Sequence, residues 1–109
     1  MAWPVNFFRS YRGNYPVKDF TEKQDLSIRA KITHSVELLE TYGPYLKPPY
    51  SKKIQPKLYE LRISAKVAVR IFYTISHNQY YLVHVFQKKS QKTPAKEIKI
   101  ALDRLKQIT

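Results

Sequence analysis

Apolar residues at helical spacing define the longest predicted element of this chain. Between residues 25 and 42 they recur at intervals of four, four and three positions, at Ile28, Ile32, Val36 and Leu39. This spacing places them on one face of an α-helix. Gly43-Pro44 is expected to end the helix, because glycine often follows a helix and proline cannot continue one.

The last part of the chain predicts a second amphipathic helix. Thr93-Pro94 is expected to begin it, with threonine as the N-cap and proline at the first helical position. Its apolar stripe consists of Ile98, Ala101, Leu102, Leu105 and Ile108. Near the N-terminus, residues 5–8 favour a short strand, and Val17 and Phe20 favour a short helix after Pro16.

Three β-rich segments follow in the centre of the chain. They are residues 58–65, 67–75 and 80–88, with a turn at residues 76–79. Connections this short require antiparallel pairing. The predicted order is therefore β-α-α-β-β-β-α, an α+β fold in which helices pack on one face of an antiparallel β-sheet. We expect one domain over residues 1–109.

Alternation along these strands sorts the side chains onto two faces. One set is expected to face the helices: Tyr59, Leu61, Ile63, Val67, Val69, Ile71, Tyr73, Ile75, Tyr81, Val83 and Val85. The other set mixes charged groups with phenylalanine: Glu60, Arg62, Ser64, Ala68, Arg70, Phe72, Thr74, Leu82, His84, Phe86 and Lys88. This second face is either an ordinary solvated surface or a functional one. Its two phenylalanines favour a function, because they are costly to leave in water.

Residues 44–57 contain four prolines, which predicts a loop between the long helix and the strands. Tyrosines and lysines are interleaved in it, a pattern suited to stacking on bases and pairing with phosphates. The alternative is a prolyl strap whose tyrosines cover the core. The candidate RNA-binding residues here are Lys47, Tyr50, Lys52, Lys53 and Lys57.

Positive charge is concentrated in the later part of the chain. The 109 residues include 20 Lys/Arg and 8 Asp/Glu, a formal net charge of +12, and residues 44–109 hold 14 of these cations but three of the acids. Self-repulsion of this kind opposes folding and usually persists because a polyanion binds, although a generic solvated surface is the alternative. Nucleic acid is favoured over an anionic membrane, because much of the charge lies in a loop and strands.

Missing residue types exclude several other classes of site. The absence of cysteine excludes a disulfide scaffold, a thiolate zinc site and a cysteine nucleophile. Two glycines cannot form a glycine-rich phosphate loop. No histidine has another ligand at metal-binding spacing, so we expect no metal and no cofactor. No apolar run could span a bilayer and residues 1–4 do not read as a secretory signal, so we expect a soluble cytoplasmic protein with no membrane partner.

The mixed face suits a reaction that needs no metal, the cleavage of RNA by the neighbouring ribose 2′-hydroxyl. A base must accept the hydroxyl proton, an acid must protonate the leaving 5′-oxygen, and cations must stabilise the charge on the phosphate oxygens. Arg62 and Arg70 suit the last task, because a guanidinium presents paired donors. Glu60, His84 or a lysine with a lowered pKa are the candidates for the base.

Three segments in order resemble the HigB-type (phage-related) branch of the RelE/ParE toxin superfamily. They are Leu58-Tyr59-Glu60-Leu61-Arg62, Val69-Arg70-Ile71-Phe72-Tyr73 and Phe86-Gln87-Lys88-Lys89-Ser90-Gln91-Lys92-Thr93-Pro94. The likeness runs from about Val5 to Leu105. It implies a RelE/ParE-like fold and the toxin of a type II toxin–antitoxin system, a ribosome-dependent endoribonuclease that cuts translated mRNA. It also implies a helix-turn-helix antitoxin as a partner.

The resemblance also implies roles for individual residues. Arg70 stands where the superfamily has a phosphate-binding arginine, and Glu60 and Arg62 occupy its Glu-Leu-Arg positions. Lys88 and Lys89 hold the basic pair that ends the last strand, and Lys92 in the same run is a candidate for RNA contact. The archetypal RelE nucleases have a lysine in place of Glu60 and a tyrosine acid in the final segment. This chain has no such tyrosine, which leaves the acid open, with His84 as a candidate.

Two functions of other classes fit the same residues. A ParE-like protein inhibits a topoisomerase by binding, with this fold but without catalysis. A basic RNA-binding module would bind RNA without arresting growth. Damaged DNA with intact mRNA would indicate the inhibitor, and salt-sensitive RNA binding without toxicity would indicate the module.

Overall fold

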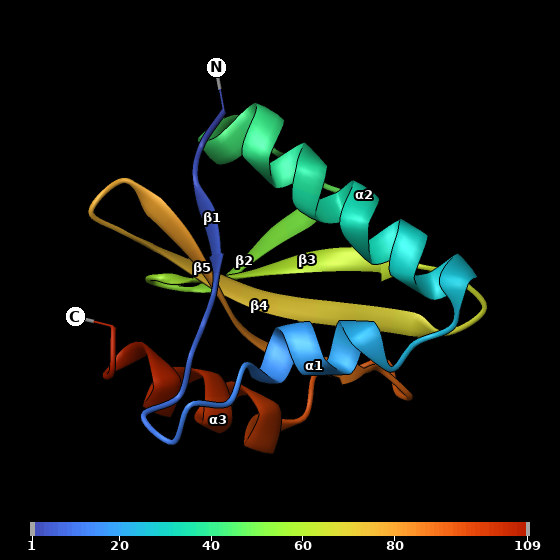
Figure 1. The fold of residues 1–109 in the computed structure, drawn as a ribbon. Coiled ribbons are helices and arrows are strands. Elements are labelled where there is room, and N and C mark those ends of the chain that lie inside the picture. Colours follow the sequence, from blue (N-terminus) through green and yellow to red (C-terminus); the bar gives the residue numbers. More distant parts are fainter. Residues whose placement is uncertain (1, 109) are drawn as a thin grey trace.

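The computed structural model describes residues 2–108, which form five strands and three α-helices (Figure 1). In chain order these are β1 (Val5–Phe7), α1 (Pro16–Glu22), α2 (Leu26–Tyr42), β2 (Ser51–Gln55), β3 (Leu58–Ser64), β4 (Ala68–Ser76), β5 (Gln79–Gln87) and α3 (Ala95–Leu105), with a 3-10 turn, η1 (Gly43–Tyr45), after α2. The predicted α+β class is confirmed, and the architecture is compatible with a RelE-like fold. Within these residues, no helix combines the length and the apolar character needed to cross a membrane.

The strands form one mixed sheet in the order β1-β5-β4-β3-β2. β2, β3, β4 and β5 pair antiparallel in sequence, as the short connections require. β1 pairs in parallel with β5, so the prediction of a wholly antiparallel sheet is wrong at this edge. In the sequence, α1 and α2 come between β1 and the other strands, and a helical connection of this kind permits parallel pairing.

The four prolines of segment 44–57 predict a loop, but part of the segment forms a strand. Ser51–Gln55 forms the edge strand β2, paired antiparallel with β3. Pro48, Pro49 and Pro56 lie outside the strand, so none of them removes a donor from the hydrogen-bond ladder. The prolines therefore bound a strand here instead of excluding one.

Helices cover both faces of the sheet, whereas the sequence predicted helices on one face. α1 and α2 pack on the first face, where Val17, Ile28, Ile32 and Leu39 join the inward residues of the strands in one buried cluster. α3 lies on the opposite side of the sheet from α2 (Figure 1). There it covers a second buried cluster: Phe8, Leu58, Phe72, Val83, Phe86 and Ala101. The phenylalanines of the mixed face are dry because α3 covers them.

A β-bulge in β5 changes the predicted alternation of that strand. Phe72 pairs with His84, but the next residue, Tyr73, pairs with Leu82, which leaves Val83 as the extra residue. As a result Leu82 joins the α1/α2 side, while Val83 and Tyr81 belong to the α3 side. The predicted faces of these three residues are therefore wrong, and those of β3 and β4 hold.

Both ends of α2 have identifiable stop signals. The Asp25 side chain caps the start by accepting a hydrogen bond of 2.9 Å from the Ile28 N–H. Gly43 ends the helix with φ +51°, in the left-handed region that favours glycine. The ring of Trp3 also lies against Gly43, so that a Cβ atom here would overlap it. Glycine thus lets the N-terminal segment close over the end of α2.

The start of α3 lies one residue later than predicted. Pro94, with extended backbone angles, is the N-cap residue, and no side-chain hydrogen bond caps the helix. Thr93 is therefore not the N-cap. Glu97 in the first turn and Arg104 in the last turn nevertheless match the polarity of the helix dipole.

Candidate functional site

Glu60, Arg62 and Arg70 lie together on the α3 side of the sheet. Arg62 of β3 pairs directly with Arg70 of β4, and Glu60 pairs with Phe72 two positions along. Because directly paired residues of antiparallel strands point to the same face, the pairing brings these three side chains into one group. We call Glu60, Arg62 and Arg70 the Glu-Arg-Arg cluster.

Glu60 is the buried centre of this cluster, with 1% of its side chain exposed. Its Oε1 accepts a hydrogen bond of 3.1 Å from Arg62 Nε and lies 3.8 Å from Arg70 Nε. The other carboxylate oxygen, Oε2, and Arg70 Nε are buried without a hydrogen-bond partner within residues 2–108. One buried carboxylate thus faces two cations, which leaves the cluster with a net positive charge.

The two arginines differ in how far they reach solvent. Arg62 exposes 32% of its side chain and Arg70 exposes 14%. Burial lowers the pKa of the Arg70 guanidinium, nearby Arg62 lowers it further, and Glu60 raises it. An arginine still keeps its proton at neutral pH, so both groups are permanent cations with donors for anionic oxygens.

Lys88 and Lys89 extend the positive surface at the end of β5. The Lys88 N–H donates to the Ala68 carbonyl at 2.9 Å, which continues the pairing with β4 past the end of the strand. Arg70, Lys88 and Lys89 line one open hollow of about 390 Å³, together with Ala68, Ser90 and Gln91. The predicted grouping of Arg70 with Lys88 is therefore present, and Lys89 joins them. Lys92 is exposed a few residues farther along, where its carbonyl accepts a hydrogen bond from Ser90.

His84 shares this face, but α3 engages both of its ring nitrogens. Its Nε2 lies 2.6 Å from Glu97 Oε1, and Arg104 Nη1 donates to its Nδ1 at 3.1 Å. A guanidinium can only donate, so Nδ1 is the acceptor and the proton on Nε2 points to Glu97. Burial lowers the pKa of His84, opposed by the hydrogen bond that His84 donates to Glu97 and reinforced by Arg104. The neutral imidazole therefore joins β5 to α3.

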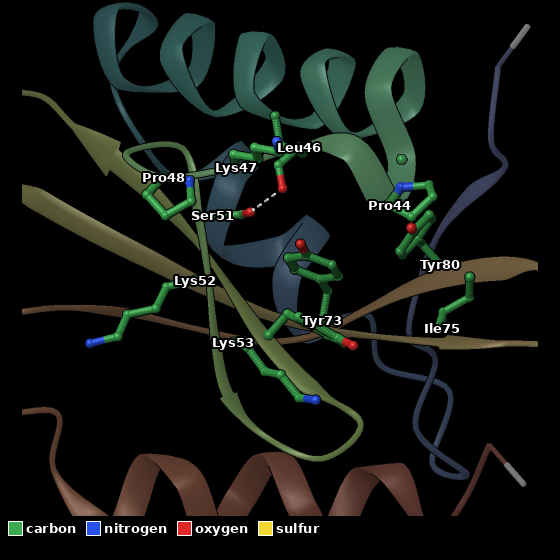
Figure 2. A pocket seen from close by; sticks show the side chains of 12 residues that line it. Pro44, Leu46, Lys47, Pro48, Ser51, Lys52, Lys53, Tyr73, Ile75 and Tyr80 are labelled. Atoms are coloured by element: carbon green, nitrogen blue, oxygen red, sulfur yellow. Dashed lines mark hydrogen bonds between the residues drawn. The ribbon is translucent and has the colours of Figure 1, made fainter.

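The cations of segment 44–57 point in several directions. Lys52 pairs with Glu60 and Lys53 pairs with Tyr59, so these neighbours face opposite sides of the sheet. Figure 2 shows their side chains leaving β2 on opposite sides. Lys57 occupies the turn after β2 with φ +67°. Lys47 and Tyr50, which precede β2 in the sequence, are exposed. Of these residues, Lys52 is therefore the one that pairs with the Glu-Arg-Arg cluster.

A second hollow, of about 320 Å³, lies on the α1/α2 side of the sheet beneath segment 44–53 (Figure 2). Tyr59, Tyr73 and Tyr80 line it, with ring centroids 5.5 Å apart for the first pair and 5.6 Å for the second. Burial raises the pKa of Tyr73 to about 12. We call this hollow the tyrosine pocket. Sequence reasoning assigned Tyr59 and Tyr73 to the core and missed the pocket. The one available signal was three tyrosines on adjacent strands beside a proline-rich segment.

Within residues 2–108, no three histidine, aspartate or glutamate side chains gather in a group that could hold a metal ion. The geometry of the Glu-Arg-Arg cluster is instead that of an anion site. Arg70 presents its donors to one open hollow with Lys88 and Lys89, while Arg62, bound to the same carboxylate, lines a separate hollow beside α2.

Comparison with protein families then places the chain. Residues 19–106 match the family described as phage-derived protein Gp49-like (DUF891). The chain belongs to the Gp49-like family. The match includes α2, the whole of the sheet except β1, and α3, and hence the Glu-Arg-Arg cluster and the basic pair. No curated protein matches the chain.

The Gp49-like family comprises RelE-like, toxin-like proteins and is associated with the toxins of toxin–antitoxin systems. The resemblance to toxins seen in the sequence is thereby supported at the level of the superfamily. A toxin of this kind implies an antitoxin as a partner.

Proposed function

We propose that this Gp49-like protein is a HigB-type toxin that cleaves translated mRNA on the ribosome without a metal ion. The observation that carries this proposal is the Glu-Arg-Arg cluster, in which a buried carboxylate holds two permanent cations beside Lys88 and Lys89. A phosphodiester is the anion that such a group suits, because each guanidinium can pair two donors with its oxygens.

In the proposed reaction, the ribose 2′-oxygen attacks the neighbouring phosphorus and the bond from phosphorus to the 5′-oxygen breaks. The 2′-hydroxyl proton passes to a base and the leaving oxygen receives a proton from an acid, giving a 2′,3′-cyclic phosphate and a 5′-hydroxyl. Arg70 and Arg62 stabilise the charge on the phosphoryl oxygens. Lys88, in the same hollow as Arg70, contacts the reacting phosphate, and Lys89 contacts its neighbour.

Glu60 is proposed as a positioning residue and not as the base. Its carboxylate is almost fully buried and already bound to Arg62, which keeps it from the substrate hydroxyl. The hydrogen bonds of His84 to α3 also leave it no free ring nitrogen for the reaction. Both residues would therefore hold neighbouring side chains in position and would take no part in proton transfer.

The charge of the chain supports a ribosomal partner. Eleven of the net twelve positive charges lie in residues 44–109, which contain the Glu-Arg-Arg cluster, the basic pair and β2. A ribosome presents a dense phosphate surface, and a protein with this charge distribution associates with such a surface quickly and in a salt-dependent manner. We propose a helix-turn-helix antitoxin as the partner that neutralises the toxin.

Induced expression in a bacterial host, followed by mapping of transcript 5′ ends, tests the proposal. We expect new ends inside translated frames and growth arrest with the wild-type chain, and neither with Arg70→Ala. Arg29→Ala, which removes an exposed arginine from α2, is the matched control and should remain toxic. Lys88→Ala provides a second variant outside the buried pair, in case Arg70→Ala folds poorly. Growth arrest with intact transcripts and damaged DNA would instead support a topoisomerase inhibitor.

A further inference from the structure

The tyrosine pocket lies outside the Glu-Arg-Arg cluster, and the proposed cleavage does not use it. Segment 44–53 forms one side, and β3, β4 and β5 supply the tyrosines opposite (Figure 2). The Ser51 hydroxyl donates to the Leu46 carbonyl at 2.9 Å, which ties the segment to itself beside the pocket. The hollow is thus bounded by a hydrogen-bonded segment on one side and the sheet on the other.

Aromatic rings dominate the inner part of this pocket. Tyr73 and Tyr80 are each 4% exposed and form its deepest lining, while Tyr59 is partly exposed. Ile75, at 40% exposure, adds an apolar patch at the rim. Phenol rings in this arrangement offer stacking and edge contacts to a flat ring, and their hydroxyl groups offer polar contacts at its border.

The outer part of the pocket is cationic. Lys47 and Lys53 line it, Lys52 borders it from β2 with a side chain that faces the Glu60 side, and none of its lining residues is acidic. A ligand that fits this combination carries a flat, partly apolar ring and a negative charge next to it. A nucleotide has both features, and its base and phosphate would meet the tyrosines and the lysines respectively.

The strand β2 connects this pocket with the Glu-Arg-Arg cluster. As one of the two edge strands of the sheet, β2 carries Lys52 towards the Glu60 side and Lys53 towards the Tyr59 side. Positive charge therefore continues over the edge from one face to the other. An RNA strand held by its phosphates at the cluster would follow these lysines around the edge.

We propose that the tyrosine pocket binds one nucleotide of the single-stranded RNA, with its base against Tyr59 and its phosphate on Lys53 and Lys47. This inference rests on the proposed ribonuclease function, because it takes the same RNA as the ligand. An acidic peptide with an apolar side chain is the other kind of occupant. Three stacked or edge-packed rings, and not an aliphatic groove, favour the nucleotide.

NMR titration of the ¹⁵N-labelled full chain tests the pocket without requiring cleavage. The background is Arg70→Ala, and the probes are adenosine 5′-monophosphate, uridine 5′-monophosphate, inorganic phosphate and a short acidic peptide. We expect saturable shifts of the Lys53, Ile75 and Tyr80 amides with at least one nucleotide, and much weaker shifts with phosphate. Shifts with the peptide alone, or with no probe, would overturn the proposal.

Two matched pairs of variants separate the pocket from general charge. Lys53→Ala should weaken nucleotide binding about three- to fivefold, the usual effect of one partly exposed ionic contact. Lys99→Ala removes the same charge from an exposed position of α3, away from the pocket, and should leave affinity unchanged. Tyr59→Leu should weaken binding at least about fivefold, and Tyr59→Phe should preserve it. Equal losses of nucleotide affinity in the two lysine variants would indicate general electrostatic attraction and not binding in the pocket.

The two proposals fail in different experiments. If transcripts remain uncut but nucleotides still bind at Lys53 and Ile75, the ribonuclease function is wrong and the pocket stands as a nucleotide site. If transcripts are cut but the pocket amides do not move, the cleavage function stands and the pocket proposal is overturned.

Discussion

Glu60 lies beneath two guanidinium groups and is the residue on which the geometry of the candidate site depends most directly. Its Oε1 is 3.1 Å from Arg62 Nε and 3.8 Å from Arg70 Nε. Buried charge is tolerated here because it is paired, and the pairing in turn restricts where the arginine side chains can lie. A catalytic arginine gains from such restriction, since a fixed donor needs no reorganisation when charge develops on the phosphate.

Replacement of Glu60 by glutamine should affect both stability and activity. Glu60→Gln leaves the buried guanidinium donors opposite a neutral amide, so we expect a loss of about 1–3 kcal/mol in the free energy of unfolding, measured with urea at pH 7. RNA cleavage should also slow, because Arg62 and Arg70 lose their anchor. Glu37→Gln on the exposed surface of α2 is the control and should change stability by less than about 0.5 kcal/mol. A Glu60→Gln protein as stable and active as the wild type would rule out the positioning role.

At the scale of elements, α3 turns a mixed sheet face into a partly buried one. It covers Phe72, Val83 and Phe86, and it binds β5 through the hydrogen bonds of Arg104 and Glu97 to His84. Arg104 Nη1 also donates to the Val83 carbonyl at 2.8 Å, at the bulge itself. The part of the face that α3 leaves open is the part with Arg70, Lys88 and Lys89.

The junction between α3 and β5 should depend on pH through His84. Its native pKa is lowered chiefly by burial, below the value of about 6.5 expected in the unfolded chain. Between these two pKa values the unfolded chain binds more protons, so the free energy of unfolding should fall as pH falls through this window. His84→Gln, which keeps a donor and an acceptor but cannot titrate, should flatten this dependence. The same slope in His84→Gln and in the wild type, with His34→Gln as the exposed control, would exclude His84 as its source.

Truncation of apolar residues should distinguish the two sides of α3. Leu102 packs against the second buried cluster, so Leu102→Ala should cost about 2 kcal/mol or more in thermal or urea unfolding. Ile100 is exposed on the same helix, and Ile100→Ala should cost less than about 1 kcal/mol. Equal costs at the two positions would show that α3 does not pack in this orientation.

Residues that interact through short-range pairing were predictable from the sequence, and those that depend on tertiary contacts were not. Glu60, Arg62 and Arg70 share a face because a tight connection fixes the pairing of β3 with β4. The bulge at Val83 was not predicted, because it depends on how β5 pairs with β4 and packs against the helices at the same time. The hydrogen bonds between His84 and α3 depend on a helix that was expected on the other face.

Segment 44–57 shows a further limit of prediction from local sequence. Its prolines were correctly identified as incompatible with a central strand, but Ser51–Gln55 lies between them at a sheet edge. The tyrosine pocket likewise forms where this segment meets three strands, so no single stretch of sequence contains it. Composition could nevertheless indicate that lysines and aromatic rings meet here.

At the scale of the whole molecule, the uneven charge suggests how the chain would find RNA in the proposed function. Residues 1–43 are nearly neutral in net charge, and the rest of the chain carries most of the excess. The cluster, the basic pair and the lysines of β2 all belong to this basic part. A broad positive surface speeds association, and the cluster within it provides the contacts for chemistry.

RNA binding should weaken steeply with salt, and one lysine should account for a measurable part of the dependence. We expect the logarithm of affinity for a 2′-O-methyl RNA, which cannot be cut, to fall linearly with the logarithm of salt concentration. Lys88→Ala should reduce the slope by about 0.7, the effect of one phosphate contact to a single strand. Lys23→Ala removes an exposed lysine from the nearly neutral part and should leave the slope unchanged. Fluorescence anisotropy measures both, and identical slopes would argue against a phosphate contact at Lys88.

The central claim is that Arg70 and its neighbours cleave mRNA on the ribosome. The most direct measurement is the single-turnover cleavage rate of a defined mRNA on purified ribosomes, with analysis of the product ends. We predict a 2′,3′-cyclic phosphate and a 5′-hydroxyl with the wild-type protein, a rate at least about 100-fold lower with Arg70→Ala, and an unchanged rate with Arg29→Ala. Intact mRNA with the wild-type protein, or equal cleavage by the Arg70→Ala protein, would contradict the claim.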